Sequence, residues 1–145
     1  MRVVVDTNIA FSAILNTDSR IARIILQPKS RINLYSTGQL LSELEEHKDK
    51  LKKIARYSDQ ELHKAVFLIT SKIRFINNRL IPPKIYLQAE SLTQEVDIDD
   101  TEFVALAEHI KAKLWSGDKA LVKALRKQWN KFITTEELYS LLVKR

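Results

Sequence analysis

Four carboxylate residues, widely separated in the sequence, each lie next to a run that predicts a strand or a helix. They are Asp6, Glu43, Asp100 and Asp118. Carboxylates gathered within several ångströms repel one another, so such a group takes up protons or, more commonly, recruits a divalent cation. Because the ligands would be oxygen atoms, without cysteine or an obvious pair of histidines, Mg²⁺ or Mn²⁺ fits better than Zn²⁺. Such an ion can polarise a phosphodiester and lower the pKa of an attacking water.

The hydrophobic pattern predicts an α/β fold whose parallel sheet brings these carboxylates to one edge. Short β-branched or alternating runs indicate strands, and apolar residues at helical spacing follow most of them. The predicted strands span residues 2–5, 31–36, 113–116 and 131–134, with another within 75–81. Strand and helix signals that repeat with short connections favour helices on both faces of the sheet. No linker or internal repeat divides the chain, so we expect one domain over residues 1–145.

Three helix predictions rest on local signals. Residues 19–27 predict a short helix that ends before Pro28. The next predicted helix runs from near Gly38 through Leu51, because leucines recur along it at helical spacing. A third begins with a capping box, and its apolar stripe extends to Ile73.

Helix capping is a competing explanation for the acidic residues, because aspartate is favoured at helix N-termini. Taken singly, Asp6, Asp100 and Asp118 suit a cap as well as a metal ligand. Glu43 by itself suits a solvated helix position. Their joint placement at one sheet edge is what favours the functional interpretation.

Composition limits the environment and the partners. The net charge is +6 and the isoelectric point is near 9.5, although several carboxylates are expected in one place. A basic exterior favours a polyanionic partner through counterion release. No apolar run approaches the roughly 20 residues that span a bilayer, and the start shows no secretory signal. We therefore expect a cytoplasmic protein without a membrane partner, and the absence of cysteine is compatible with that.

Four short motifs together resemble the PIN-domain ribonucleases. The motifs are DTN at residues 6–8, SEL at 42–44, DTEFVALA at 100–107 and WSGDK at 115–119. Their order and spacing also match that family, and the resemblance covers essentially the whole chain. It implies a three-layer α/β/α fold with a parallel sheet of about five strands. It also implies a Mg²⁺- or Mn²⁺-dependent cut of single-stranded or structured RNA.

The resemblance also assigns roles to individual residues. The family's acidic quartet, which binds metal and positions the attacking water, would be Asp6, Glu43, Asp100 and Asp118. Asn8 and Ser116 match its supporting polar positions, and Asn8 is expected to orient Asp6 through a hydrogen bond.

The third acidic position is crowded by three aspartates, Asp97, Asp99 and Asp100. We choose Asp100 because Phe103 and the ALA run follow it as in the family. Asp99 stays the alternative, and Asp97 is a candidate supporting residue behind the metal ligands.

The resemblance further implies partners. Many small stand-alone PIN domains are VapC-like toxins of toxin-antitoxin modules, held inactive by an antitoxin whose tail enters the acidic groove. RNA, a cognate antitoxin and a second copy of the chain are therefore the candidate partners. Basic residues within 48–56 could carry RNA phosphates, but a solvated helix face explains them equally well. An RNA-processing nuclease and a catalytically silent RNA- or protein-binding module remain the alternatives.

Other chemistries fit the sequence less well. A receiver domain needs an acidic pair after its first strand, and an aspartyl phosphatase needs a second aspartate where Asn8 stands. A metal-free ribonuclease would need its histidines close together, whereas His47, His63 and His109 are scattered among helix signals.

Overall fold

Four parallel strands form the centre of the protein, in the order β3-β2-β1-β4. The computed structural model describes residues 1–27 and 31–143. The strands are β1 (Arg2–Val5), β2 (Asn33–Thr37), β3 (Ile73–Ile76) and β4 (Lys113–Trp115). Because all the pairings are parallel, the carboxyl ends of the strands lie at one edge of the sheet, as the sequence predicts.

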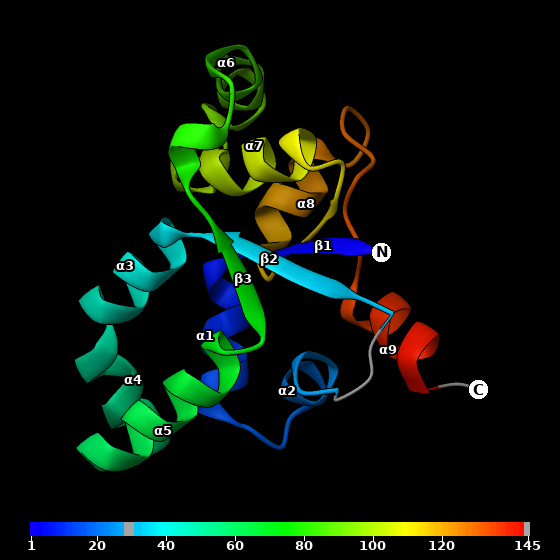
Figure 1. Cartoon of the computed structure of the whole chain (residues 1–145). Coiled ribbons are helices and arrows are strands. Elements are labelled where there is room, and N and C mark those ends of the chain that lie inside the picture. Colours follow the sequence, from blue (N-terminus) through cyan, green and yellow to red (C-terminus); the bar gives the residue numbers. More distant parts are fainter. Residues whose placement is uncertain (28–30, 144–145) are drawn as a thin grey trace.

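Helices cover both faces of this sheet and give the predicted three-layer α/β/α arrangement. In Figure 1, α6, α7 and α8 lie above the sheet, and α1, α2, α5 and α9 lie below it. The α-helices are α1 (Thr7–Leu15), α2 (Arg20–Ile25), α3 (Gly38–Glu46), α4 (Lys48–Ala55), α5 (Asp59–Thr70), α6 (Pro83–Thr93), α7 (Thr101–His109), α8 (Lys119–Leu125) and α9 (Thr135–Val143). Two short 3₁₀ helices, η1 (Asn78–Leu80) and η2 (Ile98–Asp100), precede α6 and α7.

The central position of β1 in the sheet explains why the sequence of this strand is a continuous apolar run. It pairs with β2 on one side and β4 on the other, and helices cover both faces. Val3, Val4 and Val5 consequently have no exposed surface. A strand buried on both faces needs apolar side chains at successive positions rather than at alternate ones.

The fifth strand expected at residues 131–134 is reduced to an isolated parallel bridge between Leu114 and Phe132. The backbone N–H of Leu114 donates to the Lys131 carbonyl over 2.7 Å, and the N–H of Ile133 donates to the Leu114 carbonyl over 3.0 Å. Its partner β4 is itself only three residues long, so little ladder is available. Within residues 1–27 and 31–143 the sheet therefore has four strands and a one-residue extension.

Two predicted helix boundaries are corrected. The helix expected from Gly38 through Leu51 is broken at His47, which ends α3 and precedes α4. Ile73, assigned to the apolar stripe of the third predicted helix, instead begins β3, because α5 ends at Thr70. In both places helical spacing of apolar residues continues past the point where the backbone turns.

The capping box that opens α5 and the short helix α2 agree with their predictions, and Ser19 caps α2. The predicted stop at Pro28 lies outside the described residues. Within residues 1–27 and 31–143, no helix is long and apolar enough to cross a membrane.

Candidate functional site

A small cavity of about 100 Å³ opens at the carboxyl edge of the sheet. Its lining is strongly acidic and consists of Asp6, Thr7, Asn8, Glu43, Asp97, Asp99, Asp100, Phe103 and Asp118. The structure thus brings the predicted quartet together, with Asn8 and Asp97 beside it. Ser116 does not line the cavity but contacts it from behind through hydrogen bonds.

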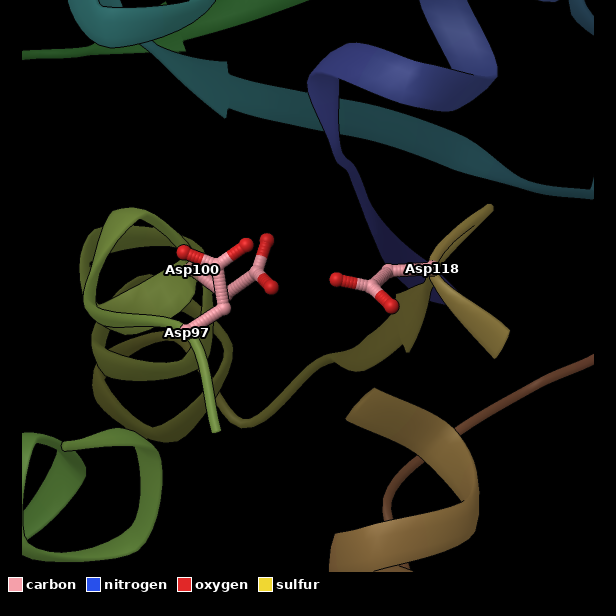
Figure 2. Close-up of side chains that lie close together, drawn as sticks. All are labelled: Asp97, Asp100 and Asp118. Atoms are coloured by element: carbon pink, nitrogen blue, oxygen red, sulfur yellow. The ribbon is translucent and has the colours of Figure 1, made fainter. Parts of the chain in front are cut away.

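Three of these aspartates, Asp97, Asp100 and Asp118, have the geometry of a metal site. Each offers a carboxylate oxygen, and the three oxygens lie within 4.8 Å of one another. Figure 2 shows Asp97 and Asp100 facing Asp118 across a small space. The first two come from the segment that starts α7, and Asp118 follows β4, so two separate segments supply the ligands. The side chain of Asp99, the alternative third acidic residue, is exposed instead.

Asp100 is the acidic residue for which capping gives no explanation. It occupies the N-cap position of α7, yet its side chain makes no capping hydrogen bond. The residue is only 8% exposed, and Oδ2 is buried without a hydrogen-bond partner. Burial and the neighbouring carboxylates, with Asp118 first among them, raise the pKa of Asp100 to about 8. A buried acceptor without a partner is unfavourable, so an ion or a proton is needed there.

Three other aspartates act as caps and also contribute to the cavity. Asp6 accepts from the Ile9 backbone N–H over 2.9 Å, and Asp118 accepts from Leu121 over 3.0 Å. Asp97 likewise accepts from the N–H of Asp99. For these residues the capping and the functional explanations hold together, because an ionised carboxylate has about four lone-pair sites and a cap uses only one of them.

Asp6 is held in place by donors from the loop after β4. The Ser116 hydroxyl donates to Oδ2 over 2.6 Å, and the Gly117 N–H donates to the same atom over 3.1 Å. Burial raises the pKa of Asp6 to about 6, although these hydrogen bonds oppose the shift. Asp6 is thus a carboxylate that remains partly protonated near neutral pH in the absence of a cation.

The predicted hydrogen bond from Asn8 to Asp6 is corrected. In the described part of the chain, the donors to Asp6 are Ile9, Ser116 and Gly117. The Asn8 side chain is exposed and lies against Gly117, where an added Cβ would approach the Asn8 Cβ to 2.9 Å. Asn8 therefore contacts the loop after β4 sterically.

Glu43 is fixed by two residues to which the sequence analysis gave no role. The Thr7 hydroxyl and the Gln39 side-chain amide each donate to its Oε1 over 2.9 Å. Gln39 also donates to the Asp99 carbonyl over 2.6 Å, which links α3 to the segment before α7. The four-residue spacing of Gln39 and Glu43 on a helix was the one available signal for this contact.

Glu102 is a second functional candidate that sequence reasoning missed. It is 5% exposed and accepts hydrogen bonds from the Thr37 hydroxyl and, over 2.8 Å, from the Asn78 amide. It also lines an open groove of about 620 Å³ next to Gln39. A charged residue inside the apolar run that follows Asp100 was the only hint in the sequence.

The donor set of the acidic cavity fits a hard divalent cation. The three aspartates with metal-site geometry, Asp97, Asp100 and Asp118, each offer a carboxylate oxygen, and Asp100 Oδ2 has no hydrogen-bond partner within the described residues. Mutual repulsion and burial, which raise the pKa of Asp100, would be relieved by a positive ion. Asp97, Asp100 and Asp118 are therefore able to hold such an ion between them.

Comparison with known proteins agrees with the sequence and the fold. The family model of the PIN domain matches residues 4–138. Among solved structures, the fold is similar to that of one chain in the crystal structure of VapBC2 from Rickettsia felis, which is bound to a DNA fragment from the VapBC2 promoter. That match has a TM-score of 0.69 and 17% sequence identity, and it covers 92% of this chain and 97% of the other. No curated protein matches the sequence.

Proposed function

The chain belongs to the PIN domain family, and from this premise we propose that it is a metal-dependent endoribonuclease that hydrolyses RNA phosphodiester bonds. The observation that carries the proposal is the state of Asp100, which is buried and does not cap its helix. It also lies with Asp97 and Asp118 within metal-binding distance. Within the described residues its buried Oδ2 has no hydrogen-bond partner, so a cation is the simplest explanation for its position.

The proposed metal ligands are Asp6, Glu43, Asp100 and Asp118, which line the cavity, and Asp97 offers a further carboxylate oxygen close to those of Asp100 and Asp118. Mg²⁺ or Mn²⁺ bound there would polarise the phosphodiester and lower the pKa of the attacking water. Both hydrogen bonds to Glu43 end on Oε1, so its Oε2 is available to orient a water in the cavity. Ser116 keeps Asp6 and Asp118 in register, since its hydroxyl oxygen contacts both residues.

We further propose that the nuclease is the toxin of a type II toxin-antitoxin module. The similarity in fold to VapBC2 supports this assignment. The corresponding partners would be an antitoxin protein and a second copy of the chain. An adjacent small antitoxin reading frame, and growth arrest that co-expression of its product relieves, would support the toxin assignment. Absence of both would favour an RNA-processing nuclease.

The decisive experiment measures cleavage of single-stranded RNA by the purified chain. We expect cleavage with Mg²⁺ or Mn²⁺ and none with EDTA. The Asp6→Asn and Asp118→Asn variants should lose at least about 100-fold in rate, beyond the loss typical of a supporting residue. Asp18→Asn is the matched control, because Asp18 is exposed in the turn before α2.

Each result has a definite meaning. Equal cleavage by both site variants and the control would rule out the acidic cavity as the active site. RNA binding without cleavage under any metal condition would instead support the catalytically silent module. Thermal unfolding of every variant must first show that it is folded.

A further inference from the structure

A second cavity, a groove of about 850 Å³, and the acidic cavity are lined by consecutive residues of the segment after β4, with Ser116, Gly117 and Lys119 in the groove and Asp118 in the acidic cavity. Ser116 and Gly117 line one end of this groove, and the same two residues hold Asp6 through hydrogen bonds. From there the groove follows α8 and the segment 130–137. The segment after β4 therefore separates the groove from the proposed active site.

The charged residues of this groove are mostly basic. The cations in its lining are Lys113, Lys119, Lys123, Arg126 and Lys127. All five are exposed, and the ion pairs among the described residues lie elsewhere and involve Lys48, Lys52 and Lys131. Two carboxylates also line the groove, and one of them, Glu137, accepts hydrogen bonds from Thr134 at the start of α9. The groove thus carries a net positive charge that is not balanced by ion pairs.

The basic run within residues 48–56 differs from this groove. Lys48 pairs with Glu45 over 2.8 Å, and Lys52 pairs with Asp59 over 2.7 Å. Part of the charge on α4 is therefore already balanced. The unpaired cations along α8 are better placed to bind an anion beside the acidic cavity, because α8 begins directly after Asp118.

The apolar part of the groove lining narrows the class of ligand. Phe132 is half-buried in the groove, packed edge-on against Trp129, and Ile21 and Val122 lie in the same lining. Single-stranded nucleic acid presents phosphates together with apolar base faces, and proteins bind it with cationic grooves that carry aromatic side chains. A peptide made of acidic residues alone, such as polyglutamate, would use the cations but would leave these apolar side chains uncovered.

We propose that this groove binds the single-stranded RNA segment on one side of the scissile phosphate, as an extension of the active site. The inference rests on the proposed function, which supplies the phosphodiester in the acidic cavity. In this arrangement an RNA strand leaves the acidic cavity near Gly117 and follows α8 toward Arg126. The lysines and the arginine of the groove neutralise the RNA phosphates. The groove therefore sets affinity for long RNA and leaves the bond-breaking step unchanged.

The test compares two triple variants that lose the same charge. The groove variant is Lys123→Gln/Arg126→Gln/Lys127→Gln, and the control is Lys50→Gln/Lys53→Gln/Lys64→Gln on α4 and α5, where all three residues are exposed. Binding of a 20-nucleotide single strand is measured in EDTA at several salt concentrations. Each phosphate contact on a single strand contributes about 0.7 to the salt slope, so losing three lowers the slope by about 2. At about 0.1 M salt this corresponds to about 100-fold weaker binding, whereas the control retains its affinity.

Cleavage assays separate this inference from the proposed function. With Mn²⁺, the groove variant should lose kcat/KM on the long strand but cut a trinucleotide as fast as the unmodified protein. Equal losses in the groove and control variants, or an unchanged salt slope, would overturn the groove assignment while cleavage itself persists. Retained RNA affinity with lost binding of polyglutamate would assign the groove to an acidic protein partner instead. Binding without any cleavage would sink the proposed function alone.

Discussion

The hydroxyl of Ser116 donates a hydrogen bond to Oδ2 of Asp6 over 2.6 Å and thereby joins the end of β4 to the end of β1. The same oxygen accepts the backbone N–H of Asp118 over 3.0 Å. One small side chain thus binds the carboxylate of Asp6 and the backbone of Asp118, two residues that lie far apart in the sequence. Ser116 is a positioning residue, since it acts on the cavity through its neighbours.

Replacing Ser116 should therefore weaken metal binding more than it weakens the fold. Ser116→Ala removes the donor to Asp6, and losing a residue that orients metal ligands typically lowers metal affinity about 10- to 100-fold. Ser116→Thr keeps the hydroxyl and should restore most of that affinity. Calorimetric titration with Mn²⁺ measures the effect. Wild-type affinity in the alanine variant would show that Ser116 does not position the site.

The gathering of the four carboxylates around one cavity was predictable because each of them lies in a short motif at a strand or helix end. Gln39 was not predictable in the same way, because it contacts the Asp99 carbonyl 60 residues away. The partners of Glu102 are similarly remote, 65 residues away at Thr37 and 24 residues away at Asn78. Local patterns place a residue on an element, whereas these contacts depend on how the elements pack.

The same distinction applies to the fold. A β-branched run buried on both faces identified β1 without ambiguity. The break at His47 left no mark in the pattern, since Leu44 before it and Leu51 after it are both buried. The expected last strand likewise depended on tertiary pairing, and a single bridge at Phe132 is all that forms.

Stability without metal should fall as pH rises. Folding raises the pKa of Asp6 from 3.8 to about 6 and that of Asp100 from 3.8 to about 8, in each case mainly through burial. A carboxyl whose pKa is raised by folding binds its proton more tightly in the folded state. The resulting contribution of each carboxyl group to the free energy of unfolding is complete below pH 3.8. It is lost as pH rises through the pKa that the group has in the folded state. Urea unfolding in EDTA should show a decreasing free energy of unfolding between pH 5 and about 8.

Two comparisons test the origin of that decrease. Asp100→Asn removes the charge that burial disfavours, so it should stabilise the metal-free protein by about 1–3 kcal/mol at pH 8 and by less at pH 5. Saturating Mn²⁺ should stabilise the unmodified chain more at pH 8, where the carboxylates are ionised, than at pH 5. At either pH it should stabilise the Asp100→Asn variant less than the unmodified chain. A pH-independent effect of the substitution would contradict this account.

Glu102 should contribute to stability through its two donors. Glu102→Gln places an amide N–H₂ against either the Thr37 hydroxyl or the Asn78 amide, both of which now donate to the carboxylate. A buried donor left without an acceptor destabilises by about 1–3 kcal/mol. Urea unfolding measures the loss, and Glu95→Gln is the exposed control. Equal stability of the two variants would show that the hydrogen bonds accepted by Glu102 do not stabilise the fold.

The close approach of Gly117 to Asn8 predicts a coupled pair. A Cβ on Gly117 would lie 2.9 Å from the Asn8 Cβ, so Gly117→Ala should destabilise the protein by about 1–3 kcal/mol, as overpacking does. Asn8→Gly alone costs about 0.3 kcal/mol in helix α1, because asparagine is already a weak helix former, but it removes the clashing atom. The double variant should therefore be more stable than the sum of the single changes predicts, by at least about 0.5 kcal/mol.

A control double-mutant cycle combines Gly38→Ala with Asn8→Gly. An added Cβ on Gly38 meets nothing within 4 Å, so the two effects should add. Additivity in both cycles, measured by urea unfolding, would show that the loop after β4 moves away from α1 without cost.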